Sequence, residues 1–351
     1  MDHSKIAVIS TGNGGQSLAA YLTLQGRRVA LYAREQERID MFRTNRFTLG
    51  GIFDEAVDID LISCDMRAVV EDAYLVMVTT PAQYHPIVAR AMAPHLVDGQ
   101  TVVLNPGRTF GTYVFDKTLR ENGCRAEVLL GETDTFVFTC RCKQVGRPVI
   151  FEIKKDVKIA GHVKEHTPLI AETLSALFPN VVPAYSVLQT GLTNIGMIFH
   201  PLPILMNITR IEAKEEFRYY IDGISPLVAT VLERLDSERV AVARGMGVEV
   251  PAAFDWLQDR YGSEGNNLYE RIQNTHAYRN VYAPTEIDTR YIHEDIQTGC
   301  VPVSCLGRRL NIPTDITDAS IKWASVVYNC DFYATGRNES AIDFDAVLAG
   351  A

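Results

Sequence analysis

The stretch Ile9–Leu22, ISTGNGGQSLAAYL, decides the fold class, because it joins an apolar, strand-like run to a helix-like segment through three glycines in four positions. A strand, a glycine-rich turn and a helix bring backbone N–H groups and the positive end of a helix dipole to one point. A pyrophosphate can bind there if no Cβ blocks its approach. We therefore predict a dinucleotide-binding turn made by Ser10, Thr11, Gly12, Asn13, Gly14 and Gly15.

This turn departs from the usual G-x-G-x-x-G pattern, since Ser10 stands at the first glycine. A glycine-rich turn can also serve only to let a helix pack tightly. Its position at the first strand-to-helix junction of an alternating chain favours the binding interpretation.

Strand-like and helix-like segments alternate through residue 185, which is typical of a mainly parallel sheet covered by helices. The expected strands are 6–9, 29–32, 75–79, 101–104, 127–130, 148–153 and 181–184, the expected helices are 16–25, 36–43, 84–92, 113–122 and 168–177, and 49–63 is an inserted hairpin. From Ser186 onward, apolar residues recur about every 3.6 positions, as on one face of a helix. Helices are expected at 188–207, 224–246, 252–261, 267–273, 291–298, 303–311 and 319–328. The pattern predicts a Rossmann-type α/β doubly wound parallel sheet over 1–185, followed by an all-α domain over 186–351.

Composition excludes several classes of partner. The net charge of −9 gives no basic footprint for nucleic acid, and no apolar run is long enough to span a membrane. The N-terminus lacks the pattern of a signal peptide, and seven scattered cysteines indicate free thiols rather than disulfides or a metal site. We expect a cytoplasmic protein that acts on small molecules.

The end of the second expected strand bears on the choice of cofactor. An acidic residue there would bind the ribose hydroxyls of NAD, but this chain reads Tyr32-Ala33-Arg34-Glu35. The carboxylate is missing, and the Arg34 guanidinium is available for a 2′-phosphate. The sequence favours NADP(H). NAD(H) stays open, since Arg34 could be a solvated charge and Glu35 could turn inward.

Two later strands end in turn-forming sequences, VTTPA (78–82) and LNPG (104–107). Loops at the carboxyl ends of such strands line the nucleotide crevice. We therefore count Thr80, Pro81 and Asn105 as cofactor contacts, although each loop could equally be an ordinary turn.

A histidine precedes a proline in GLTNIGMIFHPLPILMN (191–207). Pro201 disfavours the α conformation at His200, which should therefore lie at a kink. Thr193, His200 and Asn207 recur every seven residues, so they would form a polar stripe if the helix continued. A lone histidine on a helix is more often structural, but its place at the start of the second domain favours function.

At this point the sequence resembles the opine dehydrogenases of the octopine/nopaline type. The resemblance extends from residue 5 to about 315. It is strongest to the bacterial branch that forms N-(1-carboxyethyl) amino acids. The stretches that carry it are GNGGQSLAAYL, LNPGRT, LGET…FTCR, LTNIGMIFHPLPILMN, DSERVAVARGMG and DTRYIHEDIQTGCVPVSCLGR. It implies a Rossmann domain and an all-helical domain. It also implies that an α-keto acid, expected to be pyruvate, condenses with the amine of an amino acid and that the resulting imine is reduced.

The resemblance also implies site residues. His200 and Asp295 map onto a catalytic dyad, and Arg290 onto a contact with a substrate carboxylate. Imidazole can exchange protons near neutral pH, a carboxylate can fix its tautomer, and arginine can bind a carboxylate bidentately. The remaining candidates, each of which could equally be structural, are Thr193, Cys140 and Arg141 for the substrate and Glu132 for the cofactor.

Two other functions are compatible with the two-domain pattern. Keto-acid reductases of the ketopantoate reductase and glycerol-3-phosphate dehydrogenase type share the two-domain plan but use a lysine of the helical domain. The only lysines after residue 185 are Lys214 and Lys322, and neither lies in the first helix of that domain. A non-catalytic NADP(H) sensor would have no use for His200, Arg290 and Asp295. The helical domain could supply the surface of a homodimer, and no local motif identifies the amine donor.

Overall fold

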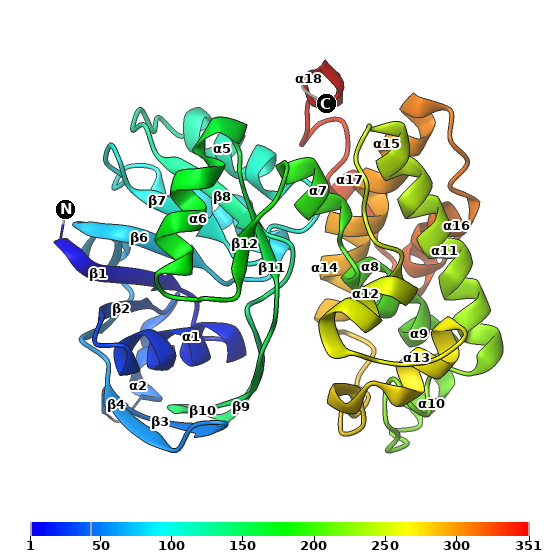
Figure 1. The fold of residues 1–351 in the computed structure, drawn as a ribbon, viewed down its shortest axis with the longest axis horizontal. Helices are drawn as coiled ribbons and strands as arrows, with labels where there is room; N and C mark the ends of the chain where they lie inside the picture. The colour runs from blue at the N-terminus through cyan, green and yellow to red at the C-terminus, as the bar shows by residue number, and fades with distance from the viewer. Residues whose placement is uncertain (1, 43, 350–351) are drawn as a thin grey trace. The chain divides into compact units, whose positions relative to one another are not determined.

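The computed structural model describes residues 2–42 and 44–349, and the chain divides into two units (Figure 1). Unit 1 contains the residues up to Gly107 together with Gly111–Thr190. Unit 2 contains Arg108–Phe110 and the residues from Gly191 onward. The sequence placed the division between residues 185 and 186, and it gave no sign that a short piece of the first half belongs to the second unit.

Eight strands of unit 1 form the main sheet. They are β1 (Asp2–Ile9), β2 (Arg28–Tyr32), β5 (Leu61–Ser63), β6 (Ala73–Val78), β7 (Thr101–Leu104), β8 (Leu129–Thr133), β11 (Val157–Gly161) and β12 (Val181–Pro183), in the order β12-β11-β8-β7-β6-β1-β2-β5. All neighbours pair in parallel except β11 with β8. The strand order reverses direction between β1 and β6, the switch point at which ligands bind in such sheets. The predicted Rossmann-type fold class is confirmed.

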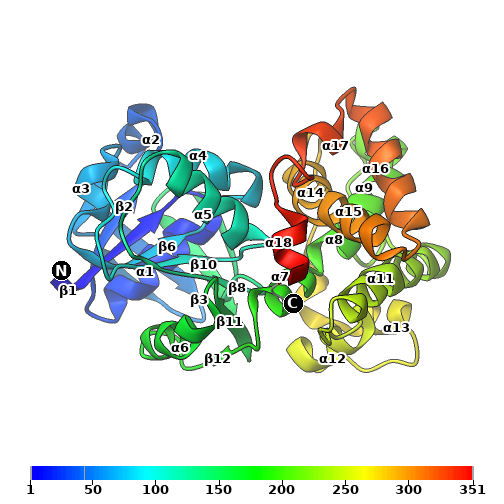
Figure 2. The same cartoon turned by 90° about the horizontal axis from the view of Figure 1, so that it is seen from above.

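Helices cover both faces of this sheet. Figure 2 shows α4 and α5 on one side and α6 on the other. Leu18 of α1 and Ile170 of α6 belong to one apolar core, while Val69 of α3, Val88 of α4 and Phe115 of α5 belong to the other. The helices are α1 (Asn13–Leu24), α2 (Gln36–Asp40), α3 (Met66–Val70), α4 (His85–Met92), α5 (Gly111–Glu121) and α6 (Thr167–Ser175), with 3₁₀ turns at Ala82–Tyr84 and Lys164–His166.

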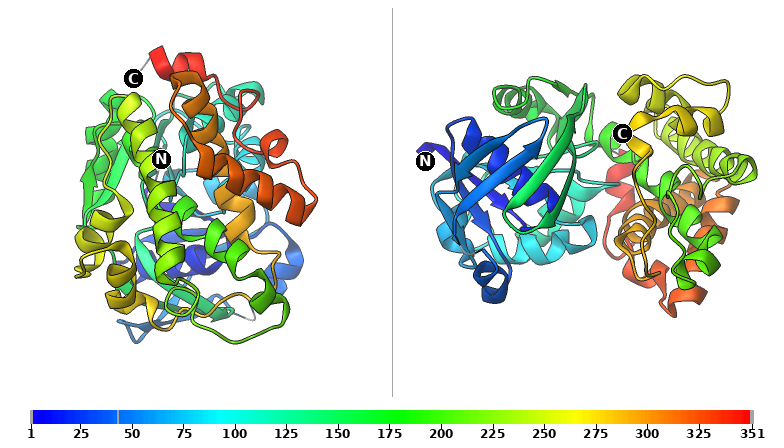
Figure 3. Two further views of the ribbon diagram at one scale, coloured as in Figure 1. Left: turned by 90° about the vertical axis from the view of Figure 1, so that its right-hand side faces the viewer. Right: turned by 90° about the horizontal axis from the view of Figure 1, so that it is seen from below.

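A second, smaller sheet has the order β4-β3-β10-β9 (Figure 3). Its strands are β3 (Arg46–Gly51), β4 (Glu55–Asp58), β9 (Phe138–Gln144) and β10 (Arg147–Ile153). The inserted hairpin predicted over 49–63 is present as the antiparallel pair β3 and β4. Its predicted end was wrong, because Leu61–Ser63 forms β5 of the main sheet. The run 148–153 is a strand, but its assignment to the main alternating series was wrong, because β10 pairs with β9 and β3.

Unit 2 is helical, as predicted, and its long helix α11 is seen in the left view of Figure 3. The helices are α8 (Gly196–Phe199), α9 (Pro201–Met206), α10 (Ile208–Glu212), α11 (Pro226–Gly245), α12 (Ala253–Tyr261), α13 (Leu268–Asn274), α14 (Arg290–Asp295), α15 (Val301–Leu310), α16 (Asp315–Tyr328), α17 (Phe332–Thr335) and α18 (Phe344–Ala349), with a 3₁₀ turn at His276–Tyr278 and a π-helical turn at Ile296–Cys300. Helix α7 (Val187–Leu192) carries the chain from unit 1 into unit 2. No helix in residues 2–42 and 44–349 has the length and apolarity needed to cross a membrane.

The helix predicted over 188–207, with a kink at His200, is divided into three short helices, so the prediction of a single kinked helix was wrong. Helix α7 ends at Leu192, α8 begins at Gly196, and α9 begins after His200. Proline at 201 and 203 removes backbone donors, so regular helical bonding cannot run through this segment. The polar stripe fails with it, since the Asn207 side chain donates hydrogen bonds to the carbonyls of Pro203 and Gly223.

Candidate active site

The turn after β1 leaves no room for a side chain at Gly14 or Gly15. A Cβ on Gly15 would lie 1.8 Å from the carbonyl oxygen of Ser10, and one on Gly14 would lie 2.9 Å from the Phe136 ring. Ser10 has a φ of 137°, a conformation that glycine adopts most readily, and its hydroxyl accepts a hydrogen bond from the Gly12 N–H at 3.1 Å. Serine can therefore replace the first glycine because its side chain bonds within the turn.

Side chains from neighbouring elements hold this turn. The Arg38 guanidinium of α2 donates to the Thr11 hydroxyl at 3.2 Å and to the Thr11 carbonyl at 2.9 Å. The Asn13 side-chain oxygen accepts the Cys142 N–H of β9 at 3.1 Å. No side chain caps the N-terminus of α1, so the amide groups of its first turn are available to a phosphate.

The loops after β6 and β7 contain buried polar atoms without a hydrogen-bond partner, Thr80 Oγ1 and Asn105 Nδ2. The Asn105 oxygen accepts from the Thr133 hydroxyl at 3.0 Å, which fixes the amide and directs Nδ2 elsewhere. Buried polar groups are seldom left unsatisfied. These atoms, together with the glycine turn and Pro81 at the same end of the sheet, fit a bound dinucleotide.

Glu132 was predicted to contact the cofactor, and the structure gives its carboxylate partners within unit 1. One oxygen accepts the Thr112 N–H and the other accepts the Thr190 hydroxyl, each at 3.0 Å. A Cβ on Gly107 would lie 2.2 Å from this carboxylate. Glu132 therefore braces the loop that follows β7.

Two arginines follow β2, Arg34 in the loop after the strand and Arg38 in α2. Arg34 is exposed, and its guanidinium pairs with the Glu35 carboxylate at 2.5 Å. Arg38, four residues further on, is anchored on Thr11 of the nucleotide turn. Sequence reasoning singled out Arg34 and missed Arg38, whose only signal was its charge near the end of this strand.

The three residues predicted to contact the substrate are divided between the two units. Cys140 and Arg141 are on β9 of unit 1, where the Cys140 thiol lies 3.9 Å from the Asn13 carbonyl oxygen. Thr193 lies between α7 and α8 in unit 2 and is 2% exposed. Their predicted contacts with substrate stay predictions.

In unit 2, His200 lies at the kink between α8 and α9, as its proline neighbour predicted. Its Nδ1 is 2.7 Å from Oδ2 of Asp295, at the end of α14. The imidazole stacks on the Tyr291 ring at 4.1 Å between centroids, and the Tyr219 hydroxyl donates to the His200 carbonyl at 2.8 Å. The two residues of the expected dyad are thus brought together and held in place.

The protonation of His200 follows from these surroundings. Burial lowers the pKa of His200 below its ordinary value and outweighs the attraction of the Asp295 carboxylate, which acts in the opposite direction. The ring is therefore neutral at pH 7, and its Nδ1–H donates to Asp295. The other ring nitrogen, Nε2, lies 3.5 Å from the Tyr220 hydroxyl and carries the lone pair that can accept a proton.

Close packing fixes the position of Asp295. A Cβ on Gly196 of α8 would lie 2.3 Å from Oδ1 of Asp295, and one on Gly299 would lie 2.7 Å from Cβ of Met197. Asp295 directly precedes the π-helical turn, a local widening of the helix that is frequent at functional sites. Small residues on α8 and in this turn allow the aspartate to reach His200.

Two arginines and a glutamate extend the pair into a charged cluster. Arg290 Nη1 lies 2.9 Å from Oε2 of Glu294. Arg108 lies with Nε and Nη2 each 3.4 Å from Glu294 oxygens and with Nη1 3.6 Å from Oδ1 of Asp295. Arg108 and Glu294 were missed from the sequence, although both lie in stretches, LNPGRT and HEDIQTG, that carry the resemblance.

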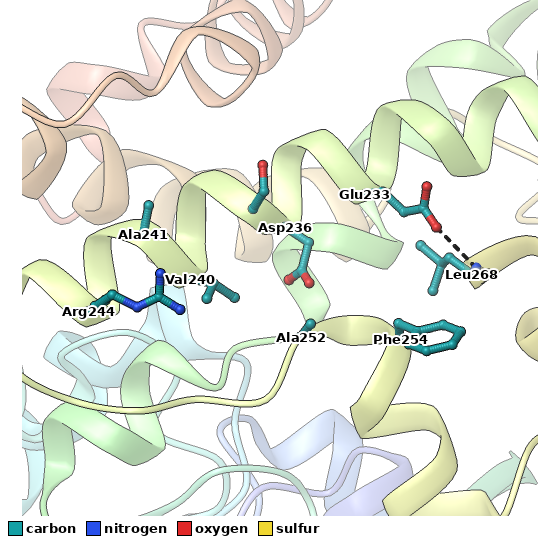
Figure 4. Close-up of a pocket in the computed structure, with 9 residues that line it drawn as sticks. Glu233, Asp236, Val240, Ala241, Arg244, Ala252, Phe254 and Leu268 are labelled. Atoms are coloured by element: carbon teal, nitrogen blue, oxygen red, sulfur yellow. Dashed lines mark hydrogen bonds between the residues drawn. The ribbon is translucent and has the colours of Figure 1, made fainter. Parts of the chain in front are cut away.

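A separate hollow on unit 2 lies beside α11 (Figure 4). Its two acidic side chains are already engaged: Glu233 accepts the Leu268 N–H at 3.1 Å, and Asp236 pairs with Arg239 at 2.6 Å. None of the predicted site residues lines it. The cluster around His200 is therefore the candidate active site of unit 2.

Comparison with known proteins agrees with both units. A family model for the α-helical domain of NAD/NADP octopine/nopaline dehydrogenases matches residues 183–328. A model for the N-terminus of NAD-dependent glycerol-3-phosphate dehydrogenase matches residues 5–106. The opine dehydrogenase of Arthrobacter sp. (strain 1C) is 35% identical over 349 residues, which cover 98% of this chain and 96% of that protein.

Solved structures show the same fold. An octopine dehydrogenase in complex with NADH and L-arginine aligns with a TM-score of 0.80 at 21% identity, covering 99% of this chain and 98% of that one. A yersinopine dehydrogenase with bound NADP⁺ aligns with a TM-score of 0.77 at 15% identity, covering 99% and 97%. The chain belongs to the opine dehydrogenase family of NAD(P)-dependent oxidoreductases, which act on CH–NH groups.

Proposed function

We propose that the protein condenses pyruvate with the amino group of an L-amino acid and reduces the resulting imine, with NADPH preferred over NADH. The product is a secondary amine that carries two carboxylates. The observation that carries this proposal is the 2.7 Å contact between His200 and Asp295, which holds a neutral imidazole beside a buried carboxylate.

His200 supplies the proton transfers of condensation. Its Nε2 accepts a proton from the ammonium group of the amino acid, which frees the nitrogen lone pair to attack the keto carbon. The imidazolium then returns the proton to the carbinolamine hydroxyl as water leaves and the C=N bond forms. Asp295 stabilises the imidazolium through Nδ1 and keeps the ring in one orientation.

Arg290 is assigned to a substrate carboxylate. One side of its guanidinium is held by Glu294, and 49% of the side-chain surface is exposed. A planar guanidinium can donate two parallel hydrogen bonds to a carboxylate, which orients the substrate as well as binding it. Both proposed substrates and the product carry such a group.

When bound, the reduced dinucleotide supplies the hydride that converts the imine to the amine. Residues of unit 1 favour the form that carries a 2′-phosphate. Ala33 stands where an acidic residue would repel that phosphate, and Arg34 and Arg38 place two cations at the end of β2 and beside the nucleotide turn.

Neighbour structures support the choice of substrates. Octopine dehydrogenase has been solved with NADH and pyruvate, and also with NADH and L-arginine. A cytoplasmic location fits the requirement for a reduced dinucleotide and a keto acid, and localisation of a tagged chain would test it. A homodimer through the helical unit stays a prediction, which light scattering would check.

The test is a substrate screen with purified protein. Pyruvate, oxaloacetate and 2-oxoglutarate are each combined with the common amino acids, and loss of the near-ultraviolet absorbance of NADPH or NADH is followed, with mass spectrometry of the product. Oxidation should require both the keto acid and the amine. Oxidation with keto acid alone would indicate a carbonyl reductase, and dinucleotide binding without any oxidation would indicate a sensor.

A further inference from the structure

Arg108 follows β7 of unit 1 in sequence, yet it belongs to unit 2 with Thr109 and Phe110. The three residues are fixed there by hydrogen bonds. The Thr109 N–H donates to the Thr298 carbonyl at 3.1 Å, and its hydroxyl donates to the Gly191 carbonyl at 2.9 Å. Arg337 donates to the Thr109 carbonyl at 2.5 Å.

The backbone of this segment is strained. Arg108 and Phe110 have φ values of 60° and 59°, in the left-handed region that residues with side chains rarely adopt. Packing holds them there, because a Cβ on Gly191 would lie 3.3 Å from the Arg108 carbonyl oxygen and one on Gly196 would lie 2.5 Å from Arg108 Nη1. Strain of this kind persists where the surroundings impose it, often at functional sites.

The Arg108 guanidinium lies in a row of alternating cations and anions that ends at the neutral His200 imidazole. In order, the groups are Arg290, Glu294, Arg108, Asp295 and the His200 imidazole, each in contact with the next. Arg108 Nη1 also donates to the side-chain oxygen of Asn194 at 3.1 Å, which fixes the plane of the guanidinium. Oδ1 of Asp295 accepts no hydrogen bond, and the Arg108 guanidinium, whose Nη1 lies 3.6 Å from it, is the cation paired with this oxygen of the buried carboxylate.

We propose that Arg108 is a positioning residue for the reaction: it holds Asp295 against His200 and Glu294 against Arg290, and so joins the proton-transfer pair to the carboxylate-binding arginine. Arg108 is 12% exposed and acts through these two carboxylates. The effect of Arg108 on the reaction rate rests on the proposed function. The effect of Arg108 on the protonation of His200 does not.

The electrostatic consequence has a definite sign. The charged groups that face His200 are Asp295 and Arg290 of α14 and Arg108; Tyr291, Tyr219 and Tyr220 surround the ring. Arg290 and Arg108 both lower the pKa of His200, whereas Asp295 raises it. Removing the charge of Arg108 should therefore raise the pKa of His200.

The first experiment follows the His200 ring by NMR across pH in the absence of substrate. The chain has eight histidines, so the His200 signal is assigned by its loss in His200→Gln. We expect Arg108→Met to move the titration upward by up to about one pH unit. Arg337→Met is the matched control, because it loosens the same segment through Thr109 and leaves the Arg108 guanidinium in place. It should leave the His200 titration unchanged.

The second experiment measures kcat and KM. In Arg108→Met we expect kcat to fall by roughly 10²-fold, because small displacements of a catalytic group are costly, and KM for the keto acid to rise as Arg290 loses its alignment. Arg108→Lys keeps the charge but cannot grip two carboxylates, so it should keep the native His200 titration and lose kcat.

A native titration in Arg108→Met, or an equal shift in Arg337→Met, would overturn the proposal. Should Arg108→Met fail to fold, Arg108→Lys decides, and native kcat in that variant would contradict the positioning role. A His200 shift in a protein that condenses no substrates would leave the electrostatic role standing and reject the proposed function alone.

Discussion

The nucleotide turn of unit 1 and the His200 cluster of unit 2 prepare polar groups in opposite ways. Near the turn, Thr80 and Asn105 keep buried atoms without partners, and the N-terminus of α1 has no side-chain cap. In the cluster, Glu294 and Asp295 each contact two basic groups. One region leaves polar groups available to a ligand, and the other pairs its acidic groups with basic ones.

This difference indicates that the two regions have different roles. Unsatisfied amides and glycines without room for a Cβ form a binding surface, because a ligand can supply the missing acceptors. In the His200 cluster the charged groups are paired with one another, and the Asp295 carboxylate against Nδ1 stabilises the imidazolium that forms when Nε2 accepts a proton. Variants in each region should therefore fail differently.

The largest expected effect comes from His200→Gln. Loss of the proton-accepting nitrogen should lower kcat by about 10²–10⁴-fold while leaving the dinucleotide Kd unchanged. His293 offers a matched control in the same unit, since its Nε2 lies 2.8 Å from Asp288, whose side chain is 81% exposed. His293→Gln should keep native kcat. A dinucleotide Kd that changes in His200→Gln as much as kcat does would break the comparison.

Asp295→Asn should lower kcat by about 10²-fold or more, because the amide cannot balance an imidazolium. In the native protein the pKa of His200 is lowered by burial, so the acid limb of kcat/KM should lie below about pH 6.5. Asp295 raises that pKa, so its loss should move the limb to still lower pH, opposite to the shift expected for Arg108→Met. If the acid limb of kcat/KM moved to higher pH in Asp295→Asn, the role assigned to Asp295 would be contradicted.

Gly15→Ala should act on binding. Its Cβ would collide with the Ser10 carbonyl, and the resulting displacement of the turn should raise the dinucleotide Kd by roughly 10–100-fold. Gly50→Ala is the control, because its Cβ would make an ordinary 3.7 Å contact with Val149. Isothermal titration measures both. The two regions would not be separable if Gly15→Ala lowered kcat at saturating cofactor as strongly as His200→Gln does.

The smallest expected effects concern cofactor choice. Arg34→Ala and Arg38→Ala should each reduce the preference for NADPH over NADH by about tenfold, the value of one hydrogen bond to a charged group. Since Arg34 is already paired with Glu35, the larger loss should occur in Arg38→Ala. Unchanged ratios of kcat/KM in both variants would reject the proposed preference for NADPH.

Buried parallel strands were predictable because their apolar runs are nearly continuous, as in β6 and β7. Strand β9, FTCRCKQ, was missed because four of its seven residues are polar. Strand β11, which lies between β12 and β8, was missed as well. The breaks within 188–207 could not be placed from periodicity, because Asn194 lies in a gap between α7 and α8 that its contacts with Arg108 and Thr109 help to fix.

The residues of the candidate site also fall into some that were predictable from the sequence and some that were not. His200, Asp295 and Arg290 were reached through motifs that resemble a known family, and the structure places them in one cluster. Arg108 contacts Asn194 and Glu294, which are 86 and 186 residues away along the chain. No local pattern reports contacts of that separation. The pairing of Arg34 with Glu35 was equally invisible, since either side chain could have turned to the nucleotide.

The central claim is that carbon and nitrogen are joined before reduction. The most direct test supplies pyruvate, a ¹⁵N-labelled amino acid identified by the screen, and NADPH deuterated at nicotinamide C4, and analyses the product by mass spectrometry. The account predicts a secondary amine that contains ¹⁵N and one deuterium on the carbon derived from the keto group. A deuterated hydroxy acid with the amino acid unconsumed would contradict it.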